Sequence, residues 1–181
     1  MKNAVFDEFV KSQQVPEHPE IDWNQRRDEW LQNLNDLYSR IQGFLKEYID
    51  SGQMQFESSS IELYEENIGR YAARQVTLKI GRKQVKFQPV GTLLIGSKGR
   101  VDVVGPGVTD ARLVLIDSKA THASDMVRVY VSLDGKPPIV PKDEPREIKW
   151  EWKMVTRPPE RRFIELTQET FFQMIMEVAN G

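Results

Sequence analysis

The sequence contains no cysteine, which excludes disulfides, a thiol nucleophile and cysteine-ligated zinc or iron–sulfur sites. Its two histidines, His18 and His122, are far apart in the chain and match no histidine-rich metal motif. No apolar run approaches the roughly 20 residues that a membrane-spanning helix requires. The first ten residues carry acids where a signal peptide is apolar. We therefore expect a cytoplasmic protein with no membrane association and no cofactor.

The charges are unevenly distributed, although the net charge of the 181 residues is only -2. Residues 1–66 carry 6 basic and 14 acidic side chains, whereas residues 67–101 carry 8 basic side chains and no acid. Such asymmetry can mark a surface for an anionic partner. The alternative is that the acidic segment folds against the basic one and neutralises it, which needs no partner.

The N-terminal third of the chain predicts one long helix. Residues 1–21 are expected to form a partly irregular arm, and Asp22 is a suitable N-cap for a helix that begins at Trp23 and ends at Asp50. Apolar residues recur in steps of three and four along it: Trp30, Leu34, Leu37, Ile41, Phe44 and Tyr48. This broad stripe favours packing on the protein's own sheet, with a coiled-coil dimer as the alternative.

Most of the remaining chain has the two-residue period of β-strands. The segment 53–57 suggests a short strand that Ser58–Ser60 breaks, and 61–68 is either strand or loop. Alternation from Arg74 onward predicts a hairpin with a basic turn, and 100–117 predicts a second hairpin whose loop lies at 105–111. Further strands are predicted at 127–133, 148–154 and 162–166, with a proline-rich surface loop at 134–146. Thr167 is expected to cap a closing helix.

These elements predict one domain, residues 1–181, of the α+β class. We expect an antiparallel β-meander of about seven strands, with a long N-terminal helix and a C-terminal helix packed on it. Helices do not alternate with the central strands, so an α/β fold with a parallel sheet is not expected.

One group of residues could form a catalytic site. GRVDVV places Asp102 on one predicted strand, and LVLIDSKA places Asp117 and Lys119 at the end of the next. This pattern resembles the motif of PD-(D/E)xK nucleases over about 20 residues. The resemblance implies that Asp102 and Asp117 bind Mg²⁺ and that Lys119 orients or helps to deprotonate the attacking water. Glu66, or else Glu62 or Glu65, would stand for the family's upstream helical glutamate.

The resemblance can be checked by geometry, because two carboxylates that share one Mg²⁺ must converge, with Lys119 beside them. Under this interpretation the basic segment 67–101 would contact the backbone of a nucleic acid.

The leading hypothesis is instead a non-catalytic accessory module, of the immunity or antitoxin type, that binds a macromolecular partner. The partner would be another protein or a second copy of the chain. We expect the binding surface to be the basic hairpin with two nearby cations, which together comprise Lys79, Arg82, Lys83, Lys86, Lys98 and Arg100. Whether the protein is an enzyme is left open by the sequence.

Overall fold

The computed structural model describes residues 21–92, 96–107, 111–126, 147–156, 159 and 161–180. The predicted strand at 127–133, the proline-rich loop at 134–146 and nearly all of the N-terminal arm lie outside these residues.

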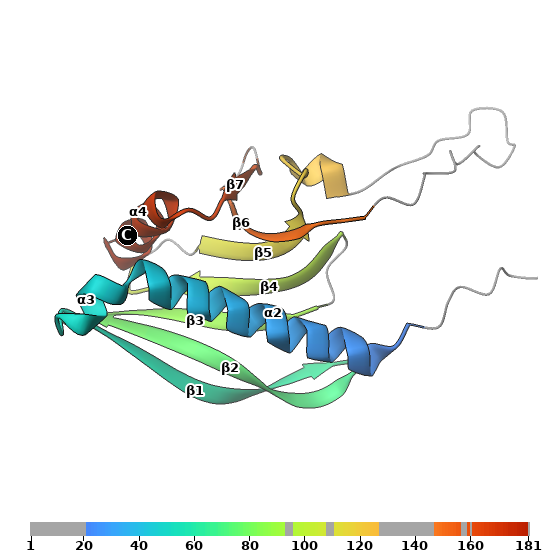
Figure 1. Cartoon of the computed structure of the whole chain (residues 1–181), viewed down its shortest axis with the longest axis horizontal. Coiled ribbons are helices and arrows are strands. Elements are labelled where there is room, and N and C mark those ends of the chain that lie inside the picture. Colours follow the sequence, from blue (N-terminus) through green and yellow to red (C-terminus); the bar gives the residue numbers. More distant parts are fainter. Residues whose placement is uncertain are drawn as a thin grey trace, which may run out of the picture.

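One antiparallel sheet of seven strands, in the order of the sequence, forms the body of the structure (Figure 1). Its strands are β1 (Met54–Glu65), β2 (Gly69–Ile80), β3 (Lys83–Gly91), β4 (Ser97–Val104), β5 (Ala111–Asp117), β6 (Trp150–Val155) and β7 (Phe163–Glu165). Every neighbouring pair is antiparallel. The predicted α+β meander is therefore confirmed.

The helices are α2 (Trp23–Phe44), α3 (Lys46–Asp50) and α4 (Gln168–Asn180), with a short 3₁₀ helix, η1, at Ala123–Met126. Asp22 caps α2 as predicted, since its side chain accepts a hydrogen bond from the backbone N–H of Gln25 at 3.0 Å. The predicted helix is interrupted at Leu45, which separates α2 from α3. None of the helices in the described part of the chain combines the length and apolar character needed to cross a bilayer.

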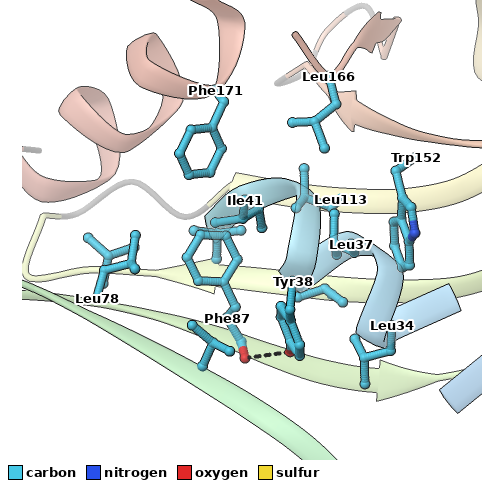
Figure 2. Packing of buried hydrophobic residues seen from close by; sticks show 14 of the residues in the cluster. Leu34, Leu37, Tyr38, Ile41, Leu78, Phe87, Leu113, Trp152, Leu166 and Phe171 are labelled. Carbon is cyan, nitrogen blue, oxygen red and sulfur yellow. Dashed lines mark hydrogen bonds between the residues drawn. The ribbon is translucent and has the colours of Figure 1, made fainter. Parts of the chain in front are cut away.

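Both α2 and α4 pack on one side of the sheet, which we call the helix face. The apolar stripe of α2 is buried there, including Trp30, Leu34 and Ile41, so the helix packs on its own sheet. Figure 2 shows this core, in which the ring of Phe87 from β3 lies between α2 and Phe171 of α4. The hydroxyl of Tyr38 donates a hydrogen bond to the carbonyl of Phe87 at 3.3 Å, which anchors α2 to the centre of the sheet (Figure 2).

Among the described residues, the opposite side of the sheet, the outer face, is covered near β5–β7. There Val114 and Ile116 pack with Ala120 in a second, small apolar cluster. The chain that follows β5 crosses to the far side of β7, where His122 pairs with Arg162. Lys153 lies beneath this crossing and donates hydrogen bonds to the carbonyls of Ser118 and Ala120, both at 2.7 Å.

The prediction that Ser58–Ser60 would break the first strand is wrong. The three serines pair with Val76, Gln75 and Arg74 of β2 in an unbroken register. The ladder is made by backbone groups and does not need apolar side chains. Arg74 also donates hydrogen bonds from Nε and Nη2 to the Ser58 hydroxyl, at 3.1 and 2.8 Å.

Candidate functional site

The residues of the nuclease-like motif are not brought together. Asp102 lies on the outer face opposite Arg112, whereas Asp117 lies opposite Trp150 at the other end of β5. Arg112 and Asp117 are five positions apart, which is roughly 16 Å along a strand, and an odd separation places their side chains on opposite faces. The two carboxylates therefore do not converge on one ion.

Asp102 is instead held by two arginines. Arg100 binds both of its carboxylate oxygens, at 2.7 and 2.6 Å, and the Nε of Arg112 lies 3.4 Å from one of them. Asp117 accepts a hydrogen bond from the backbone N–H of Lys119 at 3.0 Å, while the Lys119 side chain is exposed in the turn after β5.

None of the three candidate glutamates is helical. Glu66 is exposed in the turn after β1, and Glu62 and Glu65 are part of that strand. No set of three histidine or acidic side chains suitable for a metal ion occurs within the described ranges. The nuclease interpretation remains a prediction, and this arrangement does not favour it.

The six cations of the expected binding surface are separated by the fold. Lys79 and Lys86 point to the outer face near the β2–β3 turn, and Arg82 and Lys83 lie in or beside that turn. Arg100 is on the outer face but is paired with Asp102. Lys98 lies at the opposite end of β4, against Glu29 of α2.

Much of the charge asymmetry is neutralised within the chain. Three cations of the basic segment form ion pairs with acids of the first 66 residues: Arg70 with Glu62 at 2.7 Å, Lys79 with Glu57 at 2.6 Å, and Lys98 with Glu29 at 3.0 Å. The first two pairs follow from the register of β1 with β2, which sets the acidic strand beside the basic one.

Two of the six cations have no such contact with the described residues. Arg82 and Lys86 are exposed, and no ion pair or hydrogen bond of their side chains occurs in the part of the chain that the structure describes. Lys83 reaches the C-terminal helix, where its ammonium group donates to the side-chain oxygen of Asn180. We call Arg82, Lys83 and Lys86 the basic tip.

A hollow at the other end of the sheet was not predicted from any sequence pattern. It has a volume of about 530 Å³ and lies between the start of α2, the start of β4 and Trp150. The ammonium group of Lys98 lies 5.1 Å from the centre of the Trp150 ring, and its hydrogen bond to Glu29 holds the pKa of that carboxyl below its ordinary value. The lining comes from three distant segments, so no local motif could have revealed it.

A buried carboxylate is connected to Arg26, one of the residues that line this hollow, through Thr92. Glu65 is 6% exposed and accepts hydrogen bonds from the hydroxyl of Tyr71 and from the backbone N–H and hydroxyl of Thr92, the last two at 2.9 and 2.8 Å. Arg26 of α2 binds the carbonyl of Thr92 at 2.9 Å. These bonds tie the end of β1 and the start of α2 to the chain just after β3, which is a structural role.

Comparison of the chain with family models, with curated proteins and with solved structures finds no match.

Proposed function

We propose that this protein is a non-catalytic accessory module, of the immunity or antitoxin type, whose basic tip binds an acidic surface of a protein partner. The support comes from one contrast. Lys79 and Lys98 are neutralised by acids of the same chain, whereas Arg82 and Lys86 are exposed and lack any such partner among the described residues. Complementary charge at an interface speeds association and selects the partner.

The position of the basic tip also suits docking. The turn at Gly81–Arg82 projects from the sheet between two strands whose registers are continuous there, so its position is fixed. Lys83 is held by Asn180, which couples the turn to α4. A rigid surface loses little conformational entropy when it binds.

A protein partner fits this surface better than a nucleic acid does. Nucleic-acid surfaces usually neutralise several phosphates and carry aromatic side chains on which bases stack. The basic tip offers three cations, and the aromatic residue of β3, Phe87, is fully buried in the core. The whole chain also has a net charge of -2.

The proposal is tested by reversing the charge of the basic tip. The variant carries Arg82→Glu, Lys83→Glu and Lys86→Glu, and a matched control carries the same change at three other exposed cations, Lys46, Lys119 and Arg161. Proteins captured by the wild-type chain are identified and purified, and their affinities for all three forms are measured by titration calorimetry. We expect the variant to bind at least about tenfold more weakly, and the control to bind like the wild type.

Equal affinities of the three forms for every captured protein would contradict the proposal. A gel-shift assay tests the alternative of a nucleic-acid partner. If the wild type binds single- or double-stranded nucleic acid tightly and in a salt-dependent way, and the same variant does not, the basic tip binds nucleic acid and not a protein.

A further inference from the structure

We propose that the free edge of β1 pairs with β1 of a second copy of this chain, in an antiparallel arrangement that joins the two sheets. This inference uses other residues than the basic tip and does not depend on the proposed function. It starts from the difference between the two margins of the sheet.

In the described part of the chain, one margin of the sheet is covered by a further segment and the other is not. Beyond β7, Thr121 accepts a hydrogen bond from the backbone N–H of Phe163 at 2.8 Å, and Ala123 donates one to the carbonyl of Arg161 at 3.3 Å. On the other margin, β1 pairs with β2 along Met54–Glu65, and no described strand pairs with its second side. The outward N–H and C=O groups of such a strand are a template for another strand.

The edge of β1 has few of the features that usually prevent this pairing. It is twelve residues long, contains no proline, lysine or arginine, and keeps one register with β2 without a bulge. Its middle is Ser58–Ser60, three exposed and small residues that leave the backbone accessible. Tyr64, near its end, is 68% exposed.

A second copy is the occupant that best fits the charges. Glu57 and Glu62 form ion pairs with Lys79 and Arg70 of the same chain. These pairs reduce the electrostatic repulsion between two β1 strands. Because these glutamates are already paired, the added strand needs no cations opposite them, and a second β1, which contains no lysine or arginine, matches the edge over its whole length.

Symmetry then restricts the register. A two-fold axis perpendicular to the sheet makes one residue face the same residue of the second copy. If that residue is Ser59, the segment Met54–Tyr64 of one copy pairs with the same segment of the other, running in the opposite direction. In this register Glu57 faces Ile61 of the second copy, Glu62 faces Phe56, and no glutamate faces another. The exposed ring of Tyr64 packs beside Met54 of the second copy.

The absence of cysteine makes the register directly measurable, because a single introduced cysteine can form a disulfide only between copies. We compare Ser58→Cys, Ser59→Cys and Ser60→Cys, with Ser51→Cys as an exposed control outside β1. Directly opposed residues have Cβ atoms about 4.5–5.5 Å apart, and diagonal ones are clearly farther. After mild oxidation, Ser59→Cys should give the most dimer on a non-reducing gel.

Analytical ultracentrifugation of the wild type and of Ser59→Lys provides the second measurement. A lysine on the edge blocks strand pairing without touching the core. We expect a concentration-dependent dimer whose dissociation constant rises at least about tenfold in the variant, with an unchanged circular dichroism spectrum. A wild type that stays monomeric at concentrations of several hundred micromolar, or a cross-linking yield no higher in β1 than at residue 51, would overturn the proposal.

Discussion

Gly99 of β4 lies directly beneath the indole ring of Trp30. A Cβ atom placed on Gly99 would be 2.2 Å from Cζ3 and 2.3 Å from Cε3 of that ring. Trp30 is 1% exposed and has little room to move. We therefore expect Gly99→Ala to lower the free energy of unfolding by about 1–3 kcal/mol, as overpacked cores do. Chemical denaturation followed by tryptophan fluorescence measures this change.

Gly43 provides the matched control. It lies in the last turn of α2, and a Cβ atom placed there meets nothing within 4 Å. Because alanine favours helix over glycine, Gly43→Ala should raise the free energy of unfolding by up to about 1 kcal/mol. A Gly99→Ala variant with a free energy of unfolding equal to or above that of the wild type would contradict the close approach of β4 to α2.

Two buried tyrosines predict a loss of stability in alkali. Burial raises the pKa of Tyr38 above its ordinary value of 10.0, although nearby Arg74 opposes the shift. Burial also raises the pKa of Tyr71, and its hydrogen bond to Glu65 adds to the effect. The native state thus favours the neutral phenols, so their contribution is complete below about pH 10 and is lost as the pH rises further.

The measurement is the free energy of unfolding between pH 8 and 12, together with the absorbance of tyrosinate. The fall above pH 10 should become shallower in the double variant Tyr38→Phe, Tyr71→Phe. Ionisation of all tyrosines of the native protein in a single step near pH 10 would contradict the burial of these two phenols.

Lys153 is buried, and its ammonium group donates hydrogen bonds to two backbone carbonyls, so replacing it should lower the stability of the protein. Lys153→Met removes the donor of the Ser118 and Ala120 carbonyls beneath the crossing chain. Leaving buried carbonyls unpaired should cost about 2–4 kcal/mol of unfolding free energy. The control Lys149→Met changes an exposed lysine of the same segment and should stay within about 0.5 kcal/mol. Similar small effects of both variants would show that the two hydrogen bonds are dispensable.

The nuclease hypothesis has its own test, which is hydrolysis of single- and double-stranded DNA and RNA with Mg²⁺. Because Asp102 and Asp117 lie on opposite faces, we expect any residual activity to be the same in wild type, Asp102→Asn and Lys119→Ala. Activity of the wild type that disappears in both variants, with folding intact, would establish the enzyme and refute the non-catalytic proposal.

The fold was predictable where side-chain periodicity was unambiguous. The steps of three and four from Trp30 to Ile41 identified α2 and its buried face. The alternation around Val101 and Val103, with glycine and proline in the turn, identified the β4–β5 hairpin. These patterns are local, and each buried face repeats with the period of its own element.

The pairing of β1 with β2 was not predictable in the same way. The buried residues of β2 are Val76 and Leu78 in one half but Tyr71 and Ala73 in the other, so the buried side changes although the register with β1 does not. Two-stranded ribbons twist strongly, and β2 leaves β3 before residue 76. The apolar pattern therefore loses its period within a continuous strand.

The location of the basic surface depended on pairing that a sequence does not reveal. The neutralisation of Lys79 by Glu57 requires β1 to lie beside β2 in one particular register. Lys98 and the basic tip belong to the same basic segment but lie at opposite ends of the sheet. Only the three-dimensional arrangement separates the cations that pair with acids from those that have no acidic partner among the described residues.

Lysine footprinting of the complex with its captured partner tests the basic tip most directly. The native protein, free and bound, is acetylated briefly, and modification of each lysine is quantified by mass spectrometry. We predict that Lys86 becomes at least about fivefold less reactive in the complex, whereas exposed Lys119 and Lys149 keep their reactivity. Unchanged reactivity of Lys86 in a saturated complex would contradict the assignment of the basic tip as the binding surface.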